Sequence, residues 1–482
     1  MDQHLSVFLA EAYAKLEKMQ DSAMIARTLY NVLEKHFTPH AIWQLSRFFE
    51  KITEKDYQAY PALTRAFAIL AASTGALDFA QRLTSLLEEG STDRLLADIM
   101  LPTLSEQQYE QTVRSLAERS APPVLNLSLT AGRPSVINGY RDFTILGDRL
   151  DTEKETMLQG LRQLYGENEE LIYDIAMAER DYQRDNCYDA LVKVVALLPF
   201  LQAKNDAHTL FAALFLEIEI MVMNGQSRTA IPLMDNMRKQ MYRDGYEACL
   251  PNLDASVAWA AMYDGDYLKV AKWLRESAPD EHTEFCMLDL FCYVVKMRAY
   301  LIYGKHLAIN ALAHKLLPLL ERGNRMMDTC EVYILLALSD HARGDVEKAL
   351  DHLEQALILA EQYRYDRLLA DEGKRIYELL YVYKKARGKN EYAEYVRNLA
   401  QKVMLLYPRY LKEQLPEMPA LSPAEMKTLR LMADEQSNAE IAGLLHISLN
   451  TVKFHGKNIF EKLRVRSRAQ AVLKARELGI LD

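Results

Sequence analysis

Four side chains near the C-terminal end of the chain have the spacing of one face of a helix. They lie at positions i, i+3, i+4 and i+7, and they are Asn450, Lys453, Phe454 and Lys457. Lysine side chains can reach guanine edges or phosphates, and a phenylalanine ring can contact the methyl group of thymine. The opposite face of the same segment carries Val452, His455, Ile459 and Leu463. A helix with a largely apolar inner face and this outer face fits the major groove of double-stranded DNA.

Basic residues continue beyond this segment. We expect Asn450 and Thr451, at the N-terminus of the helix, to contact phosphates. We expect further contacts to the DNA backbone from the basic residues that follow, which are Lys462, Arg464, Arg466 and Arg468. The chain as a whole has a net charge of −9, yet residues 421–482 carry ten Lys or Arg and seven Asp or Glu. A basic end on an acidic body indicates that nucleic acid would bind at that end alone.

Helix-start signals surround the same segment. Ser422 can cap a helix, Pro423 fits its first position, and Glu425 completes a capping box. Similar signals begin at Ser437, Ser448 and Ser467. They predict four short helices over residues 423–434, 438–445, 449–463 and 468–478. Because only residues 446–448 separate the second helix from the third, the spacing is that of a helix-turn-helix.

Residues 421–480 resemble the LuxR-type DNA-binding domain. The matching positions include Leu421, Pro423, Glu425, Ser437, Asn438, Glu440, Ile441, Ala442, Ile447, Ser448, Thr451, Val452, Lys453, His455, Ile459, Lys462, Leu463, Val465, Arg468, Ala469 and Ala471. The resemblance implies a bacterial, cytoplasmic transcription regulator that binds specific sequences of double-stranded DNA, with RNA polymerase as a further candidate partner. Members of the family often bind DNA as dimers that meet through the last helix, which here offers Ala471, Val472, Ala475 and Leu478.

Two residues depart from the pattern of that family. Glu435 follows the first helix, where the family usually has glycine, and a positive φ would cost a glutamate about 1 kcal/mol. Gly456 lies inside the predicted recognition helix, where glycine costs roughly 0.5–1 kcal/mol relative to alanine. We expect Gly456 either to allow close approach of the helix backbone to DNA or to be a tolerated defect. Weak DNA binding caused by both residues would favour an alternative function, a protein-interaction scaffold with a vestigial DNA-binding domain.

The body of the chain has helical periodicity and an internal repeat. Segments of the form glycine, four residues, alanine occur at 75–80, 225–230, 344–349 and 388–393, with a longer copy at 265–271 and a copy without glycine at 185–190. The steps between Gly225, Gly265, Gly304 and Gly344 are 40, 39 and 40 residues. The glycine can end one helix in a left-handed conformation, and the alanine allows close approach of the next helix. This period is typical of a tetratricopeptide-like α-solenoid.

The body is similar to the C-terminal half of the large ATP-dependent LuxR-type activators, the family of the maltose-regulon activator. The similarity rests on residues 41–88, the later repeats and the segment LYPRYLKEQLP. It implies a helical sensor, without the nucleotide-binding domain of that family, as in a naturally short member or a partial chain. We predict an all-α protein with N-terminal helical repeats over 1–118, an irregular insert over 119–150, a solenoid that binds an inducer or a protein partner over 151–405, a linker over 406–420 and the DNA-binding domain over 421–482.

Motifs of other chemistries are missing from the sequence. It has no GxxxxGK[ST] loop, no HExxH and no GxSxG, so we predict no catalytic residue, no metal site, no cofactor and no enzymatic activity. His36 and His40 have helical spacing, but Pro39 between them argues against a shared metal-binding helix. The five cysteines are scattered, and we expect free thiols in a reducing cytoplasm. We expect no signal peptide and no membrane span.

Two rival classes fit the sequence less well. A helical nucleotide hydrolase would need a phosphate-binding loop, which the sequence lacks. A phosphorylated response regulator would need alternating strands and helices in its N-terminal region, where the periodicity is helical.

Overall fold

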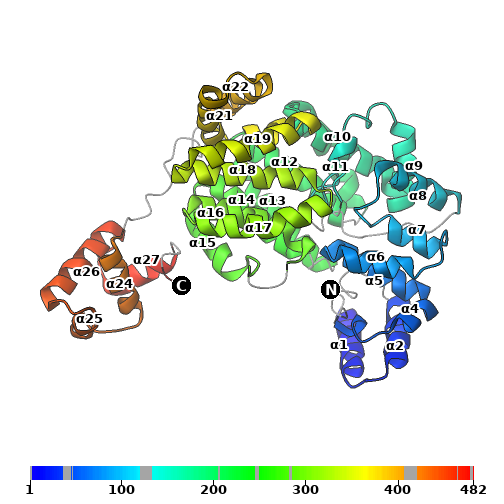
Figure 1. Cartoon of the computed structure of the whole chain (residues 1–482), viewed down its shortest axis with the longest axis horizontal. Helices are drawn as coiled ribbons and strands as arrows, with labels where there is room; N and C mark the ends of the chain where they lie inside the picture. The colour runs from blue at the N-terminus through cyan, green and yellow to red at the C-terminus, as the bar shows by residue number, and fades with distance from the viewer. Residues whose placement is uncertain are drawn as a thin grey trace.

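The computed structural model of the chain consists of packed helices (Figure 1). It describes residues 3–35, 45, 47–119, 133–139, 141–204, 207–244, 249–281, 285–406, 421–463, 465–477 and 481. Every regular element in these ranges is an α-helix or a short 3-10 helix, which confirms the all-α prediction. The predictions made for His36, His40, Arg464, Leu478, the first part of the insert and residues 407–420 of the linker fall outside the described residues.

The N-terminal part is a block of short helices around an aromatic core. Its helices are α1 (Gln3–Glu17), α2 (Ser22–Lys35), α4 (Glu54–Ala59), α5 (Pro61–Thr74), α6 (Leu77–Ser85), α7 (Thr92–Asp98) and α8 (Glu106–Glu118). Phe49 stacks on Phe67 with ring centroids 3.9 Å apart, and Phe79 meets Phe67 edge-on. This packing fixes α5, which in turn contacts α6 and α7, and α7 contacts α8.

Helix pairs form the larger part of the body. They are built from α9 (Lys154–Tyr165), α10 (Glu169–Gln183), α11 (Cys187–Ala203), α12 (Ala207–Met223), α13 (Ser227–Asp244), α14 (Leu250–Asp264), α15 (Tyr267–Glu276), α16 (Leu290–Ile302), α17 (His306–Arg322), α18 (Met326–Arg343), α19 (Val346–Tyr363), α20 (Asp366–Ala370), α21 (Lys374–Arg387) and α22 (Glu391–Leu406). Helices α10, α12, α14, α16 and α18 each contact the next in that series, and each also packs on its partner, α11, α13, α15, α17 or α19 (Figure 1). This stacking of pairs is the solenoid that the repeat predicts.

The repeated glycine and alanine have the roles expected from the sequence. Gly344 ends α18 with φ 82° and ψ 9°, a left-handed conformation that residues with a Cβ adopt at a cost. The copy at 185–190 lacks the glycine, and Asp185 there has φ 66°. The alanine that follows is buried in each copy, as at Ala190, Ala230 and Ala349. The small side chain therefore lies where two helices of a pair meet.

Part of the insert runs through the interior of the body. Residues 133–139 and 141–144, here called the strap, form no α-helix, yet most of their side chains are buried. Arg133 of the strap forms an ion pair with Glu331 of α18, and Asn138 donates to Asp328 over 3.0 Å. The guanidinium of Arg325, the residue before α18, donates to the backbone oxygens of Asn138 and Gly139. Backbone groups that no helix satisfies are thus paired by buried side chains of the solenoid.

The C-terminal domain is a cluster of four helices, α24 (Pro423–Ala433), α25 (Asn438–Leu445), α26 (Leu449–Leu463) and α27 (Arg468–Glu477) (Figure 1). These bounds confirm the four helices predicted from the sequence to within one residue at each described end. In the described part of the chain, no helix combines the length and the apolar composition that crossing a bilayer demands.

Candidate DNA-binding site

Hydrogen bonds from serine side chains fix the starts of the helices in the C-terminal domain. Ser422 and Glu425 form the predicted capping box of α24, and Ser437 and Glu440 form that of α25. The Oγ atom of Ser448 accepts from the backbone N–H of Thr451 over 3.1 Å. At α27, Ser467 accepts from the N–H of Gln470, but the Gln470 side chain accepts from Arg466, so the predicted reciprocal box is incomplete. The caps set where each short helix begins and therefore how α26 is presented.

The inner face of α26 packs on α24 and α25. Val452, Ile459 and Leu463 are buried there, as predicted, against residues that include Leu429, Met432 and Ile441. His455 is only half-buried, so its predicted place on the inner face is wrong in part. The residue that completes the inner face is Gly456, which is buried against α24. A Cβ atom at Gly456 would lie 3.2 Å from Cε of Met432.

This position of Gly456 corrects the expectation of close approach to DNA. The glycine faces the core of the domain, and its neighbours on the helix, rather than Gly456 itself, form the outer face. Its conformation is helical, and the glycine leaves room for the end of the Met432 side chain. The residue is therefore part of the packing between α24 and α26.

The outer face of α26 presents the predicted recognition residues to solvent. Asn450, Lys453, Phe454 and Lys457 are all exposed, and the ring of Phe454 is 60% exposed. Lys457 lies 3.7 Å from Glu461, one turn away, and both side chains are more than 60% exposed. An ion pair so open to water is weak, and Lys457 remains available to a phosphate or a base.

The predicted anchoring residues fall into two groups. Arg466 and Lys462 are both exposed, but Lys462 and Arg468 have partners inside the domain. The Nζ atom of Lys462 lies 2.6 Å from Oε2 of Glu425, and Arg468 donates to the backbone oxygen of Met432 over 2.8 Å. Thr451 is half-buried and hydrogen-bonded to the hydroxyl of Ser448. These three residues help to hold the domain together, which the sequence pattern did not indicate.

The predicted dimer face on α27 needs a correction. Ala471 and Ala475 are fully buried in the core of the domain with Leu429 and Ile459, and Val472 is half-buried against the same core. These alanines cannot reach a second molecule while the domain stays folded. Among the described side chains of α27, the large apolar one that is exposed is Leu473, which is 61% exposed. Sequence reasoning missed Leu473, although it lies two residues from each alanine, on the opposite side of the helix.

The turn after α24 contains a residue with a positive φ at Glu435, the position where the LuxR family usually has glycine. Glu435 has φ 59°, and His446, which ends α25, has φ 54°. Both are left-handed residues with a side chain, and each costs roughly 1 kcal/mol or more relative to glycine. The helix-turn-helix geometry is formed in spite of these costs.

Comparison with known proteins agrees with this geometry. Residues 419–475 match the family model described as bacterial regulatory proteins, luxR family, and residues 198–386 match the MalT-like TPR region. The chain therefore contains a LuxR-type domain and a MalT-like tetratricopeptide region, as the two resemblances imply.

Individual relatives cover a smaller part of the chain. The response regulator protein VraR of Staphylococcus aureus, in strains Mu3, NCTC 8325 and COL, is 35% identical over 126 residues. The matched region is 23% of this chain and 59% of VraR, so the chain spans little more than half the length of these relatives.

Proposed function

We propose that this protein is a transcription regulator that binds specific DNA sequences through α26. The observation that carries the proposal is the exposed row of Asn450, Lys453, Phe454 and Lys457 on a helix that is fixed by its caps and by a buried inner face. Direct readout of base pairs requires such a row at the surface of a rigid helix. The match to the luxR family of bacterial regulatory proteins supports the same function.

The helical-repeat body supplies the second part of the proposal. We propose that it senses a small molecule or a protein partner and so alters DNA binding. Solenoids of stacked helix pairs offer extended surfaces for partners. The match of residues 198–386 to the MalT-like TPR region supports a similar role for the body. We further propose that the regulator binds DNA as a dimer.

The structure bears on the alternative of a scaffold with a vestigial DNA-binding domain. That alternative depends on Glu435 and Gly456 as defects. Gly456 has a packing role against Met432, and the left-handed Glu435 costs only about 1 kcal/mol, which the folded domain accommodates. The regulator is therefore favoured over the scaffold.

Genome-wide DNA occupancy tests the proposal with the full-length chain. Wild-type protein should occupy a limited set of promoters, and a Lys453→Ala/Lys457→Ala variant should lose them. A Lys374→Ala/Lys402→Ala variant removes two exposed charges of α21 and α22 and is the matched control. If wild-type protein occupies promoters no more selectively than the Lys453→Ala/Lys457→Ala variant does, the proposal is contradicted.

A further inference from the structure

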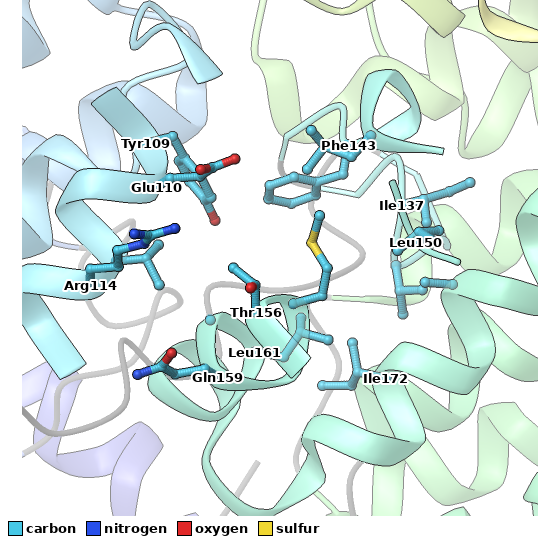
Figure 2. Close-up of a pocket in the computed structure, with 16 residues that line it drawn as sticks. Tyr109, Glu110, Arg114, Ile137, Phe143, Leu150, Thr156, Gln159, Leu161 and Ile172 are labelled. Carbon is cyan, nitrogen blue, oxygen red and sulfur yellow. The ribbon is translucent and has the colours of Figure 1, made fainter. Parts of the chain in front are cut away.

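A pocket lies between α8, α9 and residues 136–139 and 141–150 of the insert (Figure 2). It encloses about 990 Å³, counted with the part of this space that opens to solvent. Tyr109, Glu110 and Arg114 of α8 lie on one side of it, and Phe143 and Leu150 lie on the other (Figure 2).

Most of the pocket wall is apolar. The larger apolar side chains come from four elements, and they include Val113, Ile137, Phe143, Leu150, Met157 and Ile172. A wall of this kind favours the apolar part of a ligand, because burial of apolar surface gives roughly 25 cal/mol per Å². The occupant must therefore have an apolar body.

Buried hydrogen bonds hold the inner wall of the pocket in place. The carboxylate of Glu179 on α10 accepts from the backbone N–H of Val136 over 2.9 Å and from that of Ile137 over 3.0 Å. It also accepts from the hydroxyl of Ser135 over 2.7 Å. On the other side, α8 and α9 meet closely, since a Cβ atom at Gly160 would lie 3.3 Å from Cγ1 of Val113. The pocket is thus preformed, which lowers the cost of binding.

The charged groups at the pocket differ in whether they have partners. Arg149 forms ion pairs with Glu110 and with Glu153, so these two carboxylates share one guanidinium. Arg114 is exposed and lines the pocket, and it forms no ion pair within 4 Å among the described residues. Glu153 is close enough to Arg114 for their charges to interact, so this arginine has a carboxylate nearby but no direct ion pair. An anionic group on the ligand would supply that direct partner.

We propose that this pocket binds a small molecule with an apolar body and one anionic group, for example a medium-chain carboxylate. The apolar part lies against Phe143, Leu150 and Met157, and the anionic group lies at Arg114. The inference deepens the sensing role proposed above, because such a molecule would be the effector of the body. Its binding site would then adjoin the strap, which is tied to α18 by Arg133 and Asn138.

Binding to the full-length chain tests the site directly. The probe is 1-anilinonaphthalene-8-sulfonate, an apolar fluorophore with one anionic group, which decanoate or decanol then displaces. Arg114→Gln should weaken decanoate about fivefold and leave decanol unchanged, since an exposed ion pair contributes up to about 1 kcal/mol. Arg119→Gln, at the end of the same helix and outside the pocket, is the matched control for charge.

A second variant closes the pocket without a change of charge. Thr156→Trp places a large ring at a half-buried position of the wall, and it should weaken decanoate and decanol at least tenfold. Thr152→Trp, which is exposed and does not line the pocket, should leave both affinities as in the wild type. Circular dichroism of each variant establishes that it is folded. Absence of saturable binding, or binding that neither Arg114→Gln nor Thr156→Trp changes, would overturn the proposal.

A separate titration distinguishes this proposal from the proposed function. DNA affinity of the wild type is measured with and without saturating decanoate. If decanoate binds in the pocket and DNA affinity is unchanged, the sensing role is wrong and the site stands. If the protein binds its promoters and the pocket binds none of the probes, the site is wrong and the regulator stands.

Discussion

The amine of Lys462 lies 2.6 Å from Oε2 of Glu425, and the same carboxylate oxygen accepts from the backbone N–H of Ser422. One oxygen atom therefore serves both the capping box of α24 and an ion pair to the recognition helix α26. Glu425 has a side chain that is only 4% exposed, so it depends on these partners. The relationship ties the orientation of α26 to the start of α24.

Removal of the Lys462 amine should lower the stability of the domain and have little effect on its contacts with DNA phosphates. Lys462→Met should lower the free energy of opening of α24 and α26 by about 1 kcal/mol, because it leaves a buried carboxylate with fewer partners. Amide hydrogen exchange of these two helices in the full chain measures this. The slope of DNA affinity against salt concentration should change less in Lys462→Met than in Arg466→Ala, since Arg466 is exposed. Equal slopes for the two variants would restore Lys462 as a phosphate contact.

The same ion pair predicts a dependence on pH. Burial alone would raise the pKa of Glu425, but the hydrogen bonds from Lys462 and Ser422 hold it below its usual value. A lowered pKa in the folded state contributes stability above the unfolded pKa, near 4.3, that is lost as the pH falls through the folded value. Wild type and Lys462→Met should therefore differ in hydrogen exchange at pH 7 and converge below about pH 4. A difference that persists unchanged at low pH would show that the ion pair is not its cause.

Base reading and backbone anchoring are separable at the outer face of α26. If Lys453 reads a base, Lys453→Ala should cost about 1–3 kcal/mol on the cognate site and relax discrimination against altered sites. Lys457→Ala should cost a similar amount if Lys457 reads a base, because its ion pair with Glu461, at 3.7 Å, is exposed and weak. Titration of cognate and randomised DNA at two salt concentrations measures both effects. A uniform loss on all DNA, with a salt slope lowered by about one unit, would mean that Lys453 contacts a phosphate.

Gly456 should tolerate alanine without a change in DNA binding. Alanine favours the helix by up to about 1 kcal/mol, and the contact at 3.2 Å involves the flexible end of Met432. We expect Gly456→Ala to stabilise the domain by about 0.5 kcal/mol and to leave DNA affinity as in the wild type. Gly456→Leu is the contrasting variant, because its side chain has to enter the core and should destabilise the domain by 1–3 kcal/mol, roughly the cost of overpacking. A loss of DNA affinity in a stable Gly456→Ala protein would contradict the packing role.

Local signals were sufficient to predict the C-terminal domain. The caps at Ser422, Ser437 and Ser448 act over three residues, so the sequence alone specifies where the helices begin. The repeat could be predicted for a similar reason. Gly265 and Gly344 both adopt the left-handed conformation at the end of the first helix of a pair, so the same residue type recurs at that position. Burial around one helix was harder to predict. Ala471 and Leu473 are both apolar, and only the packing of α27 on α24 and α26 decides which of them is exposed.

The strap and the pocket could not be predicted from the sequence. Arg133 and Asn138 lie in a stretch whose prolines and glycines indicate an irregular loop, and such segments are usually at the surface. Their partners, Glu331 and Asp328, are about 190 residues further along the chain. No periodicity links two positions so far apart. The pocket depends on this placement, because residues next to the strap ion pairs form one of its walls.

Leu473 offers a test of dimer formation through α27. Leu473→Asp should abolish self-association on DNA. Because the side chain is exposed, the free energy of unfolding of the domain should stay within about 0.5 kcal/mol of the wild-type value. Ala471→Asp should unfold the domain, because it places a charge in the core. Sedimentation of the protein bound to DNA with one and with two half-sites measures the association. A Leu473→Asp protein that still forms dimers would exclude this face of α27 as the interface.

The ion pairs that bind the strap to the solenoid should carry a large share of the stability of the body. Glu331 of α18 pairs with Arg133 of the strap and, over 2.7 Å, with Arg298 of α16, which also pairs with Glu372. Burial alone would raise the pKa of Glu331, but the two guanidinium groups hold it below its usual value, so the group is charged at pH 7. Glu331→Gln keeps the size of the side chain and removes its charge.

This substitution leaves two largely buried guanidinium groups with one carboxylate fewer. Breaking a buried ion pair in this way costs about 3–5 kcal/mol, and we expect a loss of that size in the free energy of unfolding of the body. Glu378→Gln removes an exposed charge of α21 that pairs with Lys374, and it should change stability by less than about 0.5 kcal/mol. Urea denaturation followed by circular dichroism compares the two variants. Equal midpoints for Glu331→Gln and Glu378→Gln would show that the strap is held by its backbone hydrogen bonds and apolar contacts, without help from the buried charges.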